Sequence, residues 1–344
     1  MIPHSQPWIL NSDISAFEGC IDSKMLSYDI VSKNLEKKLA NYLNKKYALQ
    51  TGNGTQAQFL LLKALNIGKG DEVIVPTYAC DKIVRGIQAA GAIPVLCDVS
   101  PFWIMSSDSI SRHINAKTKA IILVHIFGIN AYWEKLQDFN IPIIEDICQS
   151  LGGTADNRTG TSTDYAFTSF HGTKMVSSGE GGMLFVNNEA LYEKCKYYQK
   201  KSGIICKSSD ISACLIDKQF SRIEENLSRR EAIAIAYLDN MPEHLVEDFK
   251  GVNRRSNNFR FLLRTNKSFV EIQQKFLEEN ISVRMGVDAL NHITFSSLKD
   301  NKKYVNAEKL FRTTVSIPIL PQLAESDINN IVRTVNKLHS RGVL

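Results

Sequence analysis

Short apolar segments alternate with helical segments through the first half of this 344-residue chain. Several of these segments are almost wholly apolar, which is typical of strands in a parallel sheet that helices cover on both faces. The expected strands are 47–51, 72–75, 93–96, 120–124, 141–144, 165–170 and 183–186. Helices are expected at 32–46, 56–65, 81–90 and 131–139, with Ser32 as the N-cap of the first. The pattern predicts an α/β fold with a mostly parallel, seven-stranded sheet flanked by helices.

From about residue 188 the chain changes to longer helices, and a second set of strands follows. One or two helices are expected over 211–241. Beyond Pro242, strands are expected at 259–263, 281–283 and 315–317, and helices at 267–279, 305–312 and 325–338. This mixture is typical of a smaller α+β domain. We therefore expect a large domain over 1–240 and a small C-terminal domain over 241–344, as the chain length also suggests.

Charged residues follow two of the apolar strands of the large domain. The strand at 165–170 runs into a turn that ends in Lys174, and the strand at 141–144 is followed by Glu145 and Asp146. Pyridoxal phosphate needs both groups, a lysine for a Schiff base and a carboxylate for the pyridinium nitrogen. Taken alone, Lys174 could be a surface lysine in a loop, and Asp146 could cap a helix. Together they predict a cofactor site.

A glycine-rich loop at 52–57 follows the first strand and opens a helix. It matches the dinucleotide fingerprint G-x-G-x-x-A, but the next strand ends without the acidic residue that would hold a ribose. The better interpretation is a cradle for one phosphate, in which the N–H groups of Thr55 and Gln56 and the helix dipole hold the anion. A plain capped helix is a further alternative. Ser169 could add a hydroxyl to the phosphate, and Gln149 could hydrogen-bond a ring substituent.

Composition excludes several classes of protein. The net charge is only +5 and the basic residues are scattered, which argues against a nucleic-acid surface. The seven cysteines include no C-x-x-C pair and indicate a reducing compartment, and the histidines form no metal-ligand pattern. The sequence has no signal peptide and no apolar run of membrane-spanning length. We expect a cytoplasmic protein that acts on small molecules, without a metal, a nucleic acid or a membrane as partner.

Two segments are specific enough to suggest a family. They are Ile-Glu-Asp-Ile-Cys-Gln-Ser at 144–150 and Ser-Phe-His-Gly-Thr-Lys at 169–174. Further matching segments lie at 2–5, 54–55, 70–76, 91–95, 118–122, 124–128, 306–310 and 316–319. In order and spacing the chain resembles, over almost its whole length, the DegT/DnrJ/EryC1/StrS sugar aminotransferases, which have the aspartate aminotransferase fold.

The resemblance implies a pyridoxal-phosphate transaminase that moves an amino group, usually from glutamate, to a keto sugar that is commonly linked to a nucleotide. Such reactions supply amino sugars for polysaccharides and secondary metabolites. Lys174 would be the Schiff-base lysine and Asp146 the partner of the pyridinium nitrogen. Further cofactor contacts are implied for Gly54, Thr55, Gln56, Cys80, Gln149 and Ser169. A homodimer with its active site at the subunit interface is also implied. Related dehydratases carry histidine in place of Lys174, so the lysine favours transamination.

The chain departs from the family pattern in two places. Cys80 stands where an aromatic residue usually stacks on the cofactor, and a thiol stacks less well, so Tyr78 is a candidate substitute. In the segment that reaches a phosphate across the dimer, Ile205 replaces an asparagine and Lys207 an arginine. We expect Lys207 to supply the charged contact there. These departures favour one alternative, a cofactor-binding regulator or scaffold of the same fold; a nicotinamide dehydrogenase is a weaker third option.

Overall fold

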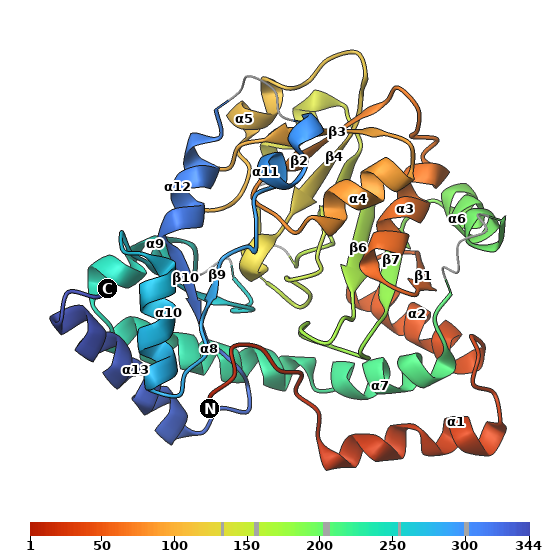
Figure 1. Cartoon of the computed structure of the whole chain (residues 1–344). Helices are drawn as coiled ribbons and strands as arrows, with labels where there is room; N and C mark the ends of the chain where they lie inside the picture. The colour runs from red at the N-terminus through yellow and green to blue at the C-terminus, as the bar shows by residue number, and fades with distance from the viewer. Residues whose placement is uncertain (132–133, 155–157, 202–206, 254–255, 299–302) are drawn as a thin grey trace.

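The computed structural model of the chain describes residues 1–131, 134–154, 158–201, 207–253, 256–298 and 303–344. Two β-sheets flanked by helices organise these residues (Figure 1). The larger sheet contains β1 Tyr47–Thr51, β2 Glu72–Pro76, β3 Ile93–Cys97, β4 Thr118–Val124, β5 Ile143–Asp146, β6 Tyr165–Ser169 and β7 Gly182–Val186. Its strands lie in the order β1-β7-β6-β5-β4-β2-β3. The predicted fold class is confirmed.

The strand directions bring one end of nearly every strand to a common edge. In the described chain, all strands of the large sheet run the same way except β7, which is antiparallel to β1 and β6. The carboxyl ends of β1, β2, β4, β5 and β6 therefore lie at the same edge as the start of β7. The turn that carries Lys174 joins β6 to β7 and lies at this edge too, which is where ligands bind in such sheets.

Helices cover both faces of the large sheet. Side chains of α3 Gly54–Ala64, α4 Lys82–Ala89 and α6 Glu189–Lys201 pack on one face, and those of α2 Ile30–Tyr42 and α7 Asp210–Phe220 on the other. Strand β7 separates the two cores, because Leu184 belongs to the first and Phe185 to the second. Both faces of the central strands are thus buried, as their apolar sequences predict.

Helix α2 begins differently from the prediction. Ser32 lies inside the helix, and the N-cap residue is Asp29, which provides no side-chain cap. Asp210 on α7 takes over this role, because its carboxylate accepts hydrogen bonds from the N–H groups of Asp29, Val31 and Ser32 and from the Ser32 hydroxyl, at 2.6–3.1 Å. A carboxylate at a helix N-terminus also interacts favourably with the helix dipole.

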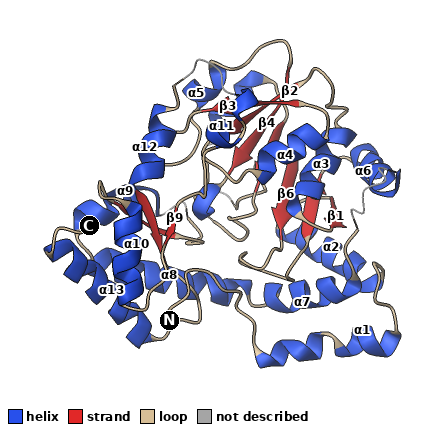
Figure 2. Cartoon of the chain, in the orientation of Figure 1, coloured by secondary structure: helices blue, strands red, loops and turns tan. Residues whose placement is uncertain are grey.

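The smaller sheet lies in the C-terminal part of the chain, packed against long helices (Figure 2). It consists of β8 Phe261–Arg264, β9 Arg284–Met285 and β10 Thr314–Ile317, in the order β8-β10-β9. The predicted strand at 281–283 is shifted, because Ile281 pairs with Ile2 in an isolated bridge and β9 starts three residues later. The N-terminal residues therefore lie against this sheet. The boundary near residue 240, at the end of α8 Ile223–Asn240, stays a prediction.

The predicted helix at 131–139 is a 3₁₀-helix, η3 Glu134–Phe139, and residues 132–133 lie outside the described ranges. The remaining helical segments are η1 Asn11–Ala16, α1 Glu18–Ser23, α5 Ser107–Ser111, η2 Ile126–Gly128, α9 Glu243–Asn253, α10 Phe269–Glu278, α11 Asn291–Thr294, η4 Ser296–Leu298, α12 Val305–Thr313 and α13 Glu325–Ser340. None of the helices in the described ranges is both long and apolar enough to cross a membrane.

Candidate active site

Two glycines bring the start of α3 onto the edge of the large sheet. Gly182 pairs with Thr51 and with Ser169, the last residues of β1 and β6. A Cβ on Gly182 would lie 2.3 Å from the carbonyl carbon of Asn53, and a Cβ on Gly54 would lie 3.1 Å from the Cβ of Ser169. The missing side chains therefore allow the N-terminus of α3 to sit directly beside Ser169.

This helix N-terminus offers donors for an anion. The side chain of Asn53 accepts a hydrogen bond from the N–H of Gln56 at 2.9 Å, so the Gln56 donor that we expected at a phosphate is already used. The N–H groups of Gly54 and Thr55, in the first turn, have no carbonyl partner within the helix. The hydroxyl of Ser169 accepts from the His171 N–H at 3.3 Å, and its own proton can be donated. The arrangement suits a phosphate group.

Asp146 and Lys174 lie close together at the same edge. The carboxylate of Asp146, at the end of β5, accepts hydrogen bonds from the backbone and the thiol of Cys148. Burial raises the pKa of Asp146, and the Cys148 bonds and the Lys174 ammonium oppose this rise without cancelling it. Because the turn at 148–150 is not helical, Asp146 caps no helix there. Lys174 also acts electrostatically on the thiol of Cys80, so three predicted site residues are near neighbours.

Glu145, one residue before Asp146, is fully buried, and both of its carboxylate oxygens accept hydrogen bonds. Its carboxylate accepts hydrogen bonds from His125 Nε2 (3.1 Å), from the N–H groups of Gly160 (2.8 Å), Ser162 (3.1 Å) and Thr163 (3.0 Å), and from the Thr163 hydroxyl (3.2 Å). Burial favours the neutral acid, but these bonds outweigh it and keep the pKa of Glu145 below its usual value. The network fastens the end of β5 to the loop that leads into β6.

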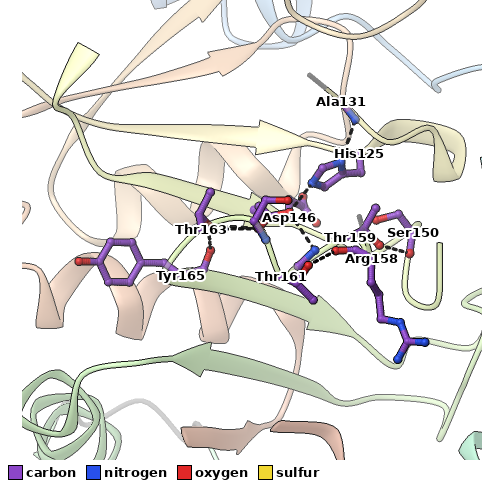
Figure 3. Close-up of polar contacts among 12 residues, drawn as sticks. His125, Ala131, Asp146, Ser150, Arg158, Thr159, Thr161, Thr163 and Tyr165 are labelled. Atoms are coloured by element: carbon purple, nitrogen blue, oxygen red, sulfur yellow. Dashed lines mark hydrogen bonds and ion pairs between the residues drawn. The ribbon is translucent and has the colours of Figure 1, made fainter. Parts of the chain in front are cut away.

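His125 completes this network from the end of β4. Its Nδ1 accepts a hydrogen bond from the Ala131 N–H at 3.0 Å (Figure 3). The neutral ring therefore carries its proton on Nε2, which faces Glu145. Sequence reasoning assigned no role to His125 or Glu145. The register of β4 against β5, which pairs Leu123 with Glu145, was the signal that could have brought them together.

The residues expected to contact the cofactor ring have different environments. Gln149 accepts a hydrogen bond from the Phe127 N–H through Oε1 at 2.7 Å, which holds its side chain beside the site. Cys80 is exposed. Tyr78 is fully buried, its ring 6.1 Å from that of Phe127 in an edge-to-face contact. Because its hydroxyl points at Gly286, the residue after β9, Tyr78 is a core residue and does not replace the stacking aromatic.

Another aromatic residue lies at the lysine instead. The ring of Phe259, just before β8, is buried, and its centroid is 5.6 Å from Lys174 Nζ. Of the segment expected to cross the dimer, Ile205 lies outside the described residues. Lys207 is exposed, and its carbonyl oxygen lies 3.4 Å from the position of a Cβ on Gly52. The described end of this segment thus borders the phosphate cradle of its own chain.

A lysine, a carboxylate and an anion-binding helix start at one sheet edge are the groups that a pyridoxal-phosphate enzyme uses. A Cβ on Gly54 would meet Ser169 and the Cys148 thiol, and Lys174 acts electrostatically on that thiol, so the cradle fits a phosphate close to the lysine. Within the described ranges, no three His, Cys, Asp or Glu side chains are grouped to hold a metal ion.

Comparison with known proteins identifies the family. The model of the DegT/DnrJ/EryC1/StrS aminotransferase family matches residues 8–336, and the chain belongs to this family. The membership confirms the predictions of family, enzyme class and cofactor.

Two curated relatives and one solved structure illustrate the similarity. GDP-perosamine synthase of Escherichia coli O157:H7 is 28% identical, over 98% of this chain and 99% of the relative. The dTDP-3-amino-3,6-dideoxy-alpha-D-galactopyranose transaminase of Aneurinibacillus thermoaerophilus is 26% identical, over 88% of this chain and 89% of the relative. The PLP form of Spr1654, a putative sugar aminotransferase of Streptococcus pneumoniae, shares the fold with a TM-score of 0.89 at 24% identity and covers 100% and 99% of the two chains.

Proposed function

We propose that this protein transfers an amino group from an amino acid such as glutamate to a keto sugar that is linked to a nucleotide. One observation carries the proposal: Lys174, Asp146 and the start of α3 meet at the same edge of the sheet. The sugar and the nucleotide are suggested by the relatives, a GDP-perosamine synthase and a dTDP-amino-sugar transaminase. The products would serve the synthesis of amino sugars for polysaccharides or secondary metabolites.

Each site residue has a role in this proposal. Pyridoxal phosphate, when bound, supplies an electron sink for the negative charge that develops at the reacting carbon. Lys174 would hold the cofactor covalently. Its freed amine would carry the proton from Cα of the donor to the cofactor carbon, and in the second half of the transfer it would deliver a proton to the sugar carbon that receives the nitrogen. Asp146 holds the proton on the ring nitrogen by its negative charge. The N–H groups of Gly54 and Thr55 and the Ser169 hydroxyl bind the phosphate.

Three further residues lie at the edge of this cofactor site. The side chains of Gln56 and Gln149 and the thiol of Cys80 would contact the cofactor at its edges. For Gln149 the support is the bond from the Phe127 N–H, which fixes the carbonyl end of its side chain. For Cys80 it is the electrostatic contact with Lys174 and Asp146.

The proposed enzyme is a homodimer of the cytoplasm. Helix α1 lies at the edge of the molecule, beside α7 (Figure 1). Apolar side chains that are 39–69% exposed lie on α1 and the neighbouring segments: Ile9, Leu10, Ile14, Ile21, Met25, Leu26 and Ile30. Such a concentration of exposed apolar side chains marks an interaction surface, and a second copy of the chain would cover it in an isologous interface. No disulfide links the described cysteines, in keeping with a reducing compartment.

The function is tested with purified protein loaded with pyridoxal phosphate. Glutamate and a panel of GDP- and dTDP-linked keto sugars should yield 2-oxoglutarate, and borohydride should fix the cofactor on a peptide that contains Lys174. Lys174→Ala should abolish both results, whereas Lys119→Ala, which changes an exposed lysine of β4, should leave them unchanged. Fixation at Lys174 without turnover of any sugar would favour the regulator or scaffold. Fixation on another lysine would refute the assignment of the site.

A further inference from the structure

Helix α8 carries two buried polar residues, Asn226 and Arg230, which are 4% and 5% exposed. They are four residues apart and therefore lie on the same face of the helix. Arg230 Nε donates a hydrogen bond to Asn226 Oδ1 at 2.9 Å. Burial lowers the pKa of Arg230 to about 9, so its guanidinium is still charged near pH 7. Such a buried pair is stable only when its remaining donors also find acceptors.

The Asn226 amide holds the turn that carries the lysine. Its Nδ2 donates a hydrogen bond to the carbonyl oxygen of Met175 at 3.1 Å, and Met175 directly follows Lys174 in the sequence. Within the turn, the Lys174 N–H donates to the His171 carbonyl at 2.9 Å. Because Arg230 holds the oxygen of the same amide, the backbone on the C-terminal side of Lys174 is fixed relative to α8.

The Arg230 guanidinium holds a second segment, which borders the lysine from the other side. Its Nη1 donates to the backbone carbonyls of Ile319 (2.6 Å), Asn258 (3.2 Å) and Phe259 (3.3 Å). The centroid of the Phe259 ring is 5.6 Å from Lys174 Nζ. One pair of side chains on α8 thus connects the backbone of the lysine turn to the backbone of the aromatic residue beside the lysine amine.

We propose that Asn226 and Arg230 are positioning residues, which hold the Lys174 turn and the Phe259 ring at a fixed separation and so limit the positions of the lysine amine. The inference rests on the assignment of Lys174 under the proposed function. A lysine side chain is flexible, and an ammonium group is attracted to the face of an aromatic ring. Fixing the backbone at one end of Lys174 and the ring at the other therefore keeps its amine in place for reaction.

Two forms of the cofactor separate this role from a merely structural one. Pyridoxal phosphate forms a covalent bond with the lysine through its aldehyde. Pyridoxamine phosphate has the same ring and phosphate but carries an amine instead, so it binds without that bond. A general loosening of the fold would weaken both forms, whereas a displaced lysine weakens only the form that reacts with it.

The test measures the affinity of the cofactor-free protein for each form by fluorescence titration. In Asn226→Asp the carboxylate still accepts from Arg230 but has no N–H to donate to the Met175 carbonyl. The affinity for pyridoxal phosphate should fall about threefold to tenfold, the effect of one hydrogen bond, and that for pyridoxamine phosphate should stay unchanged. The matched control is Asn240→Asp, at the exposed end of the same helix, which should bind both forms as the wild type does.

The outcomes are distinct. Wild-type affinity for pyridoxal phosphate in Asn226→Asp, or equal losses for the two forms, would overturn the proposal. If this variant lacks the wild-type circular dichroism spectrum, Phe259→Leu, which removes the ring and leaves the backbone bonds in place, decides by the same comparison. Borohydride separates the proposal from the proposed function. Cofactor fixed on another lysine refutes the assignment of the site, whereas fixation at Lys174 with wild-type affinity in Asn226→Asp refutes only the positioning role.

Discussion

Replacing Glu145 by Gln should destabilise the protein severely, because an amide nitrogen cannot accept the hydrogen bonds that the carboxylate receives. In one orientation the new N–H₂ group faces the Gly160 N–H and His125 Nε2; in the other it faces the N–H groups of Ser162 and Thr163. Either way, two buried donors lose their acceptor. At about 1–3 kcal/mol for each, the free energy of unfolding should fall by roughly 2–6 kcal/mol.

Chemical denaturation followed by circular dichroism measures this loss, and an unchanged m-value would show that the same surface is exposed on unfolding. The matched control is Thr163→Val, which removes one hydroxyl donor and leaves Glu145 with its other partners. It should cost only about 0.5–1.5 kcal/mol, the net contribution of one hydrogen bond. If Glu145→Gln costs no more than Thr163→Val, the carboxylate is not the acceptor that fastens β5 to the following loop.

The same variant should change the pH dependence of stability. The folded pKa of Glu145 lies below its usual value of 4.5, so its contribution is fully present above pH 4.5 and is lost as the pH falls through the folded pKa. The difference in unfolding free energy between the wild type and Glu145→Gln should therefore shrink on acidification below that value. A difference that stays constant down to pH 3 would contradict the lowered pKa.

Three further predictions concern the cofactor site. Asp146→Ala should reduce turnover by orders of magnitude with little change in melting temperature; a loss of roughly 0.5–1.5 kcal/mol with activity retained would mean that Asp146 only holds the turn through its bond from the Cys148 N–H. Gly182→Ala places a Cβ against Asn53 and should shift the start of α3, so the affinity for pyridoxal phosphate, measured by fluorescence titration, should fall at least tenfold; unchanged affinity would exclude α3 as the cradle. Lys207→Ala should weaken cofactor or sugar binding while sedimentation still shows a dimer, and wild-type constants for both ligands would place Lys207 outside the site.

Local sequence patterns predicted the strands of the large sheet well, because burial on both faces leaves an unmistakable apolar run. Strand β1 matches its predicted bounds, whereas β5 runs from Ile143 to Asp146 and so ends two residues beyond the predicted 141–144. The start of α2 was missed since its cap comes from Asp210, far away in the sequence. Strand 281–283 was displaced because the N-terminal Ile2 pairs with Ile281. Neither contact leaves a local trace in the sequence.

Some residues of the candidate site could likewise be predicted from local sequence patterns, and others could not. Lys174 and Asp146 follow strands at recognisable motifs, and the parallel order of the sheet was enough to bring them to one edge. A hydrogen bond between Arg260 and His4 joins segments that lie far apart in the sequence, and no local sequence pattern predicts such a contact. Tyr78 was a plausible ring partner by position alone, but it packs in the core, because its side chain points toward the smaller sheet.

The position of β1 at the edge of the large sheet has a consequence for biosynthesis. Among the described strands its only neighbour in the sheet is β7, so the first strand of the chain cannot pair until the last strand of the sheet has left the ribosome. A ribosome adds roughly 5–20 residues per second, which leaves β1 without a partner for several seconds or more. Loop closure over such a separation is also slow. During that interval an apolar strand is open to chaperones and to other nascent chains, so the yield of soluble protein should depend on the rate of translation between β1 and β7.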